Sequence, residues 1–129
     1  MESILRIARE TSFLEQISTM YQLGLEMEIL GRFSNHAGFD GVMIGNKHSR
    51  FHLEFTYRHG ESAPRSNSKD NLLVFYVPNP LEWEKTVRRM SDAGFIQKDA
   101  INPYWNENGI TFEDLEGYRI VISKESWDR

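Results

Sequence analysis

The chain of 129 residues contains no cysteine and only four prolines. Without cysteine there is no disulfide, no thiolate nucleophile and no cysteine ligand for zinc or an iron–sulfur cluster. Basic residues are also few, since 15 lysines and arginines stand against 19 acidic residues and leave a net charge of −4. A nucleic-acid-binding domain usually needs a basic face to neutralise phosphates, so we expect no nucleic-acid partner.

Long hydrophobic runs are missing as well. No segment approaches the roughly 20 apolar residues of a transmembrane helix, and the first residues lack the pattern of a signal peptide. We therefore expect a cytoplasmic protein with no membrane partner. The content of 40% hydrophobic and 26% charged residues is typical of a globular domain, and the length suits one domain or two small modules that share a core.

The first half of the chain has the pattern of a strand, a helix and three strands. Residues 3–8 alternate as a strand does, and Ser12 with Glu15 forms a capping-box pattern at the start of a helix. Gly24 is expected to end this helix in the left-handed conformation. The three strands are predicted at residues 26–33, 41–45 and 51–57.

The second half repeats this order. A strand at 72–77 is followed by a helix that Asn79 and Pro80 begin and Gly94 ends. Short strands are predicted at 95–97, 110–113 and 118–123. The elements follow in the same order in both halves, and the two helix-ending glycines, Gly24 and Gly94, lie 94 − 24 = 70 positions apart. We therefore interpret the chain as a duplication. The predicted modules are 1–58 and 72–129, joined by a polar linker at 59–71; two unrelated α+β segments in succession are the alternative.

Three stretches of the sequence resemble the vicinal oxygen chelate superfamily, which includes glyoxalases, bleomycin-resistance proteins and extradiol dioxygenases. These are HLEFTY at 52–57, NLLVFYV at 71–77 and FEDLEGYRI at 112–120. The resemblance implies an α+β fold in which two βαβββ modules with curved mixed sheets form a cup, so that 1–129 is a single glyoxalase-like domain. In the third stretch Asp114 can bond the backbone of its own turn, and Gly117 tolerates positive φ.

The resemblance also locates four positions that hold a metal in metal-dependent members, namely Glu2, Glu54, Leu72 and Val121. Two of them have hydrocarbon side chains that cannot bind a cation. A divalent metal held by Glu2 and Glu54 alone would be weakly bound. We therefore expect no cofactor, with a divalent metal on these two carboxylates as the alternative.

Strand alternation separates the residues that pack under a helix from those that line the cup. Leu53 and Phe55 fall on the first side, whereas His52, Glu54 and Thr56 fall on the second. The same alternation directs the polar side chains of Arg6, Tyr76 and Arg119 into the cup. Leu72, Val74 and Val121 add an apolar wall, and such a mixture is typical of a small-molecule site. The candidate catalytic acid and base are His52 and Glu54. The candidate ligand-binding residues are Arg6, Thr56, Tyr76, Tyr104, Trp105 and Arg119.

Each candidate also has a structural interpretation. Arg6 and Glu54 can form an ion pair between strands, and Tyr104 and Trp105 can serve local packing. We predict a glyoxalase/bleomycin-resistance-like protein that binds a small organic molecule in the cup without a tightly held metal. The alternatives are a metal-dependent lyase or isomerase of the glyoxalase type that uses Glu54, and a fold that serves only assembly. The resemblance further implies a homodimer.

Overall fold

The computed structural model describes residues 1–127. The chain divides into two compact units, Met1–Pro64 and Arg65–Arg129. Each unit is built from a strand, a helix and three further strands, and the two units are described in turn. In the described part of the chain, no helix is long and apolar enough to cross a membrane.

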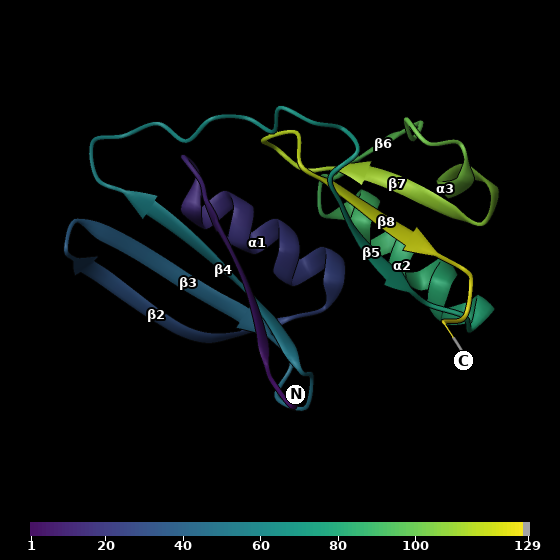
Figure 1. Ribbon diagram of the computed structural model, residues 1–129, viewed down its shortest axis with the longest axis horizontal. Helices are drawn as coiled ribbons and strands as arrows, with labels where there is room; N and C mark the ends of the chain where they lie inside the picture. The colour runs from purple at the N-terminus through teal and green to yellow at the C-terminus, as the bar shows by residue number, and fades with distance from the viewer. Residues whose placement is uncertain (128–129) are drawn as a thin grey trace. The chain divides into compact units, whose positions relative to one another are not determined.

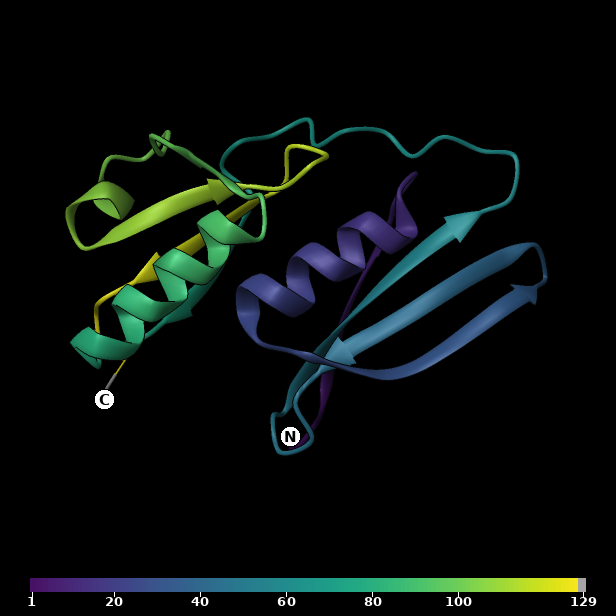
Figure 2. The ribbon, with the colours of Figure 1, turned by 180° about the vertical axis from the view of Figure 1, so that it is seen from behind.

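The first unit is a four-stranded mixed sheet with one helix. Its elements are, in chain order, β1 (Leu5–Glu10), α1 (Leu14–Leu25), β2 (Glu28–His36), β3 (Phe39–Gly45) and β4 (Phe51–Arg58). The strand order is β1-β4-β3-β2, with β1 and β4 parallel and the other neighbours antiparallel. Figures 1 and 2 show α1 lying across one face of this sheet.

The second unit repeats the same architecture. Its elements are β5 (Leu72–Tyr76), α2 (Pro80–Asp92), β6 (Ile96–Lys98), α3 (Tyr104–Glu107), β7 (Gly109–Glu113) and β8 (Arg119–Ser123). The order β5-β8-β7-β6 matches that of the first sheet, again with one parallel pair, β5 and β8. The predicted pair of βαβββ modules is therefore confirmed. The short helix α3 was not predicted, because four residues are too few to show a helical period.

Each helix packs on its own sheet through apolar side chains. In the first unit, the Tyr21 ring of α1 lies 4.9 Å from the Phe55 ring of β4, and Ile17 and Leu53 are buried with them. In the second unit, Met90 of α2 and Ile120 of β8 are fully buried, and the indole nitrogen of Trp83 on α2 also donates to a β8 carbonyl at 3.0 Å. Burying one large apolar side chain stabilises the fold by about 1.5–3 kcal/mol, so these contacts hold each helix to its sheet.

The predicted ends of the first helix are wrong by one or two residues. The helix begins after Phe13 rather than Ser12, and the Ser12 hydroxyl accepts a hydrogen bond from the Ala63 amide at 2.7 Å. At the other end, Gly24 is a buried helical residue and Glu26 adopts the left-handed conformation with φ of 55°. The backbone bond that closes the last turn fixes Glu26 in this conformation, which local sequence alone did not reveal.

The second helix follows its prediction more closely. Asn79 caps it by accepting a hydrogen bond from the Glu82 amide at 3.0 Å, and Pro80 is the first helical residue. Gly94 has a φ of 99° just beyond the end of the helix. Both ends are therefore as expected from capping chemistry.

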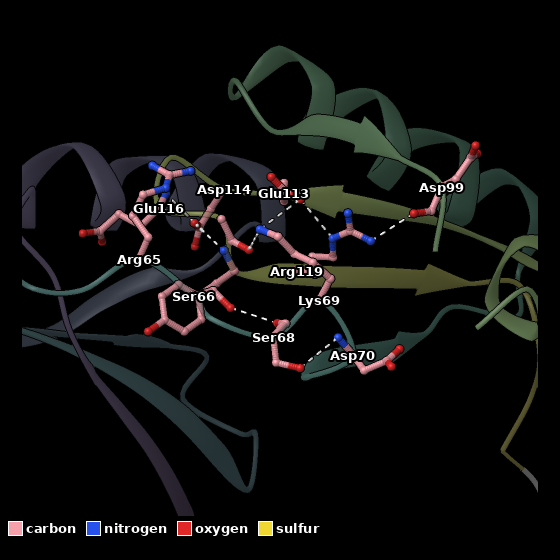
Figure 3. Close-up of polar contacts among 12 residues, drawn as sticks. Arg65, Ser66, Ser68, Lys69, Asp70, Asp99, Glu113, Asp114, Glu116 and Arg119 are labelled. Atoms are coloured by element: carbon pink, nitrogen blue, oxygen red, sulfur yellow. Dashed lines mark hydrogen bonds and ion pairs between the residues drawn. The ribbon is translucent and has the colours of Figure 1, made fainter. Parts of the chain in front are cut away.

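The turn between β7 and β8 is organised by Asp114, as predicted. Its carboxylate accepts hydrogen bonds from the backbone amides of Glu116 and Tyr118 at 2.7 and 3.1 Å, and Gly117 has a φ of 85°. Part of the segment predicted as a linker lies against this turn (Figure 3). The Ser66 amide donates to the Glu116 carbonyl, and Lys69 donates to the Gly117 carbonyl. These bonds attach residues 66–69 to the second unit.

Candidate functional site

We use "distal face" for the face of each sheet that points away from that sheet's own helix. On the first sheet, Arg6 of β1 lies opposite His52 of β4 in the register, and Glu54 follows two residues later on the same face. The Arg6 guanidinium donates from Nε to His52 Nε2 at 2.9 Å and from Nη1 to Glu54 Oε2 at 3.2 Å. We call these three residues the Arg6 cluster; the structure brings them together as alternation predicted.

The hydrogen-bond pattern defines the protonation of His52. Arg6 Nε always carries its hydrogen, so His52 Nε2 must accept with a lone pair. The imidazole is therefore neutral in this arrangement, with its hydrogen on Nδ1. The positive charge of Arg6 and the negative charge of Glu54 cancel, and His52 adds a hydrogen-bond donor without a charge. The Arg6 cluster as a whole is therefore electrically neutral.

The Arg6 cluster is accessible on one side. The Arg6 side chain is 49% exposed, whereas that of Glu54 is 13% exposed. Three polar atoms of the cluster have no partner among the described residues: Arg6 Nη2, Glu54 Oε1 and His52 Nδ1. Thr56 continues the same face along β4. Donors and an acceptor thus stand side by side, as a ligand with both kinds of polar group requires.

An apolar surface adjoins the Arg6 cluster on the distal face. Its side chains lie where three strand residues are glycine: a Cβ at Gly41 would overlap the Phe33 ring, one at Gly45 would approach Leu30, and one at Gly31 would approach Met43. We call this surface the apolar floor; it consists of Leu30, Phe33 and Met43. The register places Met43 directly opposite Glu54, so the floor begins beside the polar groups.

The sequence interpretation missed the apolar floor. The predicted strands at 26–33 and 41–45 contain Gly31, Gly41 and Gly45, as the structure does, but no role in packing was assigned to these glycines. A signal was present, because Gly41, Met43 and Gly45 alternate and therefore share one face of a strand. Glycine inside a strand often marks close approach of another group.

The distal face of the second sheet has a buried arginine instead. Arg119 of β8 donates from Nε to Glu113 at 3.0 Å and from Nη1 to the Asp99 carbonyl at 3.0 Å, as Figure 3 shows. Lys69 adds a second cation 3.4 Å from the Glu113 carboxylate. Burial alone would raise the pKa of Glu113, but the hydrogen bond from Arg119 and the charge of Lys69 lower that pKa below its usual value.

This environment bears on the predicted ligand role of Arg119. The side chain is 8% exposed and is used to hold β7 and the Asp99 backbone to β8. Glu113 was not among the predicted site residues, because only the β7–β8 register brings it opposite Arg119. Contact between Arg119 and a ligand stays a prediction.

The predicted aromatic residues of the second unit lie near one end of its sheet. Tyr104 and Trp105 of α3 meet edge to face with ring centroids 5.0 Å apart. The Tyr104 hydroxyl donates to the Glu125 carboxylate at 3.0 Å, and this bond raises the pKa of Tyr104 above its usual value. Tyr76, the last residue of β5, packs against Trp127 with ring centroids 5.7 Å apart. Their contact with a ligand also stays a prediction.

The residues of the family's metal positions do not fit a resident divalent metal. One carboxylate oxygen of Glu54 accepts from Arg6, whose positive charge opposes a second cation there. Glu2 is exposed outside β1, and Leu72 and Val121 offer no ligand atom. Among residues 1–127, no group of three or more histidine, aspartate or glutamate side chains is arranged to hold a metal ion.

Fold and sequence comparisons agree on the class of this protein. The paired βαβββ modules have the fold of glyoxalases and fosfomycin-resistance proteins, as the resemblance implied. A fosfomycin resistance protein FosX from Mesorhizobium loti matches with a TM-score of 0.73 at 7% identity, covering 98% of this chain and 94% of that one. The antibiotic binding protein TnmS3 from Streptomyces sp. CB03234 matches with a TM-score of 0.68 at 13% identity, covering 98% of each chain.

Within that superfamily, the chain belongs to the YycE-like family. Residues 5–56 match the YycE-like N-terminal domain, and residues 70–124 match the YycE-like C-terminal domain. The uncharacterized protein YycE of Bacillus subtilis is 44% identical over 118 residues, which cover 92% of this chain and 85% of that protein. The crystal structure of a YycE protein of unknown function from that organism superposes with a TM-score of 0.89 at 41% identity, covering 98% of this chain and 93% of that one.

Proposed function

We propose that this protein binds a compact organic molecule on the distal face of its first sheet. The Arg6 cluster holds the polar groups of that molecule, and the apolar floor receives its hydrocarbon part. The observation that carries the proposal is the position of Arg6: its guanidinium is half exposed, is oriented by His52 and Glu54, and keeps Nη2 unpaired among the described residues.

The chemistry of the Arg6 cluster defines the kind of ligand. Arg6 Nη2 suits a carbonyl, carboxylate or phosphonate oxygen, because a guanidinium donates along fixed directions. Glu54 Oε1 suits a hydroxyl or amide hydrogen of the same molecule. Since the cluster carries no net charge, we expect a ligand that combines acceptor and donor groups rather than a highly charged anion.

The relatives support small-molecule binding as the general role. FosX is a fosfomycin resistance protein and TnmS3 an antibiotic binding protein. At their low identities the likeness concerns the fold, so the ligand of this chain has to follow from its own residues. An apolar floor beside a neutral polar cluster supports a molecule with one polar and one apolar side.

A metal-dependent lyase or isomerase is less well supported. In such an enzyme, Glu54 would have to bind a metal in place of Arg6. Among the family's four ligand positions, Glu2 is the one other carboxylate that could help to hold that metal. Two carboxylates bind a divalent cation weakly. No observation in the described residues favours this second function.

The test is a thermal-stabilisation screen with metabolites and antibiotics against three proteins. These are the wild type, Arg6→Ala and the control Arg32→Ala. Arg32 is 46% exposed and pairs with Glu15 of α1 at 2.9 Å, so it matches Arg6 in exposure and pairing but lies on the helix side. We expect a hit to stabilise the wild type and Arg32→Ala by several degrees and Arg6→Ala by much less.

Two outcomes would overturn the proposal. One is a panel in which no compound stabilises the wild type, or in which each hit stabilises Arg6→Ala equally. The other is a stoichiometric zinc, nickel, iron or manganese ion in protein purified without chelator that Glu54→Gln abolishes.

A further inference from the structure

Three chain segments meet at one end of the second sheet. In the register, Tyr76 of β5 and Gly109 of β7 both lie opposite Ser123, the last residue of β8. The Val77 amide donates to the Ser123 carbonyl, and the Lys124 amide donates to the Asn108 carbonyl. The residues that follow β8 are therefore held between the end of β5 and the segment that precedes β7.

This end of the sheet has exposed aromatic rings. The Tyr76 and Trp127 rings are inclined by 31° with centroids 5.7 Å apart, which is close to an offset stack. Trp127 is 65% exposed and Tyr104 is 47% exposed. Large rings that face water gain little from their own packing, whereas they present π-surface to a ligand.

A carboxylate stands beside these rings. Glu125 Oε2 accepts from the Tyr104 hydroxyl at 3.0 Å, and Oε1 accepts from the Asn108 side-chain amide at 2.9 Å. Its own backbone amide donates to Ser123 Oγ at 3.1 Å. Three bonds fix Glu125, yet both of its oxygen partners are neutral. In residues 1–127 no cationic side chain forms an ion pair with this carboxylate.

The neighbouring lysine does not neutralise Glu125. Lys124 extends to the other side of the chain, where its ammonium lies 4.6 Å from the centre of the Trp83 ring on α2. Successive residues of an extended chain point to opposite sides, which explains why Lys124 and Glu125 separate. Tyr76 lies opposite Ser123 in the register, and Glu125 follows two residues later on the same side of the chain, so Tyr76 and the carboxylate belong to the same end of the sheet.

We propose that Tyr76, Tyr104, Glu125 and Trp127 form a binding site for an organic ammonium ion, such as a primary amine or a quaternary ammonium group. The rings supply the negative faces that attract a cation, and the carboxylate supplies the opposite charge. The site lies within the second unit and does not depend on the proposed function of the Arg6 cluster. If the contact of Tyr76 with Trp127 only shields the end of the sheet, this end should not bind a cation more tightly than a neutral molecule of the same shape.

The test compares choline with 3,3-dimethyl-1-butanol, its neutral isostere of the same shape. Titration is followed by calorimetry and by the indole N–H signal of Trp127 in NMR spectra, assigned with Trp127→Leu. We expect choline to bind with a Kd of about 1 mM and the isostere to bind at least fivefold more weakly, because only choline gains the cation–π and ionic contributions. Equal binding of the two compounds, or no binding of choline, would overturn the site.

Variants localise the effect. Glu125→Gln keeps hydrogen-bonding groups but removes the charge, and we expect it to weaken choline binding about fivefold to tenfold. Glu84→Gln removes a charge from an exposed residue of α2, the helix on the other face of the sheet, and it serves as the matched control. Arg6→Ala should bind choline as the wild type does, which separates this site from the Arg6 cluster. An equal loss of choline binding in Glu125→Gln and Glu84→Gln would show that only the net charge of the protein matters, and it would contradict the proposal.

Discussion

The two sheets have the same strand order but use their distal-face arginines in opposite ways. Arg6 on the first sheet is 49% exposed and reaches a neutral histidine and one glutamate. Arg119 on the second sheet is 8% exposed and binds the Asp99 carbonyl and Glu113, which also pairs with Lys69. Arg6 thus faces solvent with one nitrogen unpaired among the described residues, whereas Arg119 holds neighbouring segments of the second unit together.

This difference shows how a duplicated fold divides its tasks. An exposed ion pair contributes little to stability, so the fold depends little on Arg6, in keeping with the ligand role that we propose for it. A buried charge must be fully paired, and each partner then becomes necessary to the fold. Under the proposed function, the distal face of the first sheet binds a ligand, whereas the Arg119–Glu113–Lys69 group of the second sheet anchors the segment at 66–69.

The largest expected effect is the loss of the buried arginine. Arg119→Ala leaves the Glu113 carboxylate buried with a single, more distant cation, so we expect the free energy of unfolding to fall by about 3–5 kcal/mol. Arg6→Ala should cost less, about 1 kcal/mol, because Arg6 is 49% exposed and water can take the place of its side chain beside Glu54. Urea denaturation of both variants measures the contrast.

A double variant sharpens this contrast. Arg119→Met combined with Glu113→Leu removes both charges and should recover most of the lost stability, since a buried ion pair is about as stable as an apolar pair of similar volume. Equal losses for Arg6→Ala and Arg119→Ala would show that exposure does not distinguish the two sheets.

A second expected effect concerns pH. The pKa of Glu113 is lowered in the folded protein below the usual value of a glutamate, so the ionised group stabilises the fold at pH values above that usual value. This stabilisation is lost as the pH falls through the folded pKa. Glu113→Gln removes the titrating group, and its unfolding free energy should decline less steeply with acid below about pH 4.5 than that of the wild type. Parallel profiles would contradict the assignment.

The smallest expected effect concerns the glycines of the first sheet. A Cβ at Gly41 overlaps the rigid Phe33 ring, whereas one at Gly31 lies 2.9 Å from the flexible end of Met43. We expect Gly41→Ala to lower the free energy of unfolding by about 1–2 kcal/mol and Gly31→Ala by less than about 1 kcal/mol. Denaturation of the two variants, with the ligand screen repeated on each, checks whether displacing Phe33 also weakens binding.

Much of the fold could be predicted because local rules were sufficient. The alternation of apolar and polar residues in β4 placed Leu53 and Phe55 under the helix and His52 with Glu54 on the other face. Asp114 and Gly117 specified their turn through side-chain bonding and positive φ. The end of the first helix was misplaced because Glu26, rather than a glycine, adopts the left-handed conformation.

The candidate site was predictable only in part. Residues on one strand follow from period-two alternation, so Arg6, His52 and Glu54 were expected on one face. The glycines of β3 and the side chains above them belong to different strands, and their contact depends on register. The pairing of Arg119 with Glu113 and the contact of Glu125 with Tyr104 also join different segments of the chain, so alternation within one strand could not predict them.

The sequence by itself determined the two βαβββ modules, the helix caps of α2 and which strand residues share a face, because each depends on neighbours within a few residues. The tertiary structure alone decided that Arg6 is exposed and Arg119 buried, and that the Glu125 carboxylate meets the Tyr104 hydroxyl. Burial and pairing depend on the strands and segments that pack nearby, and these are distant in the chain.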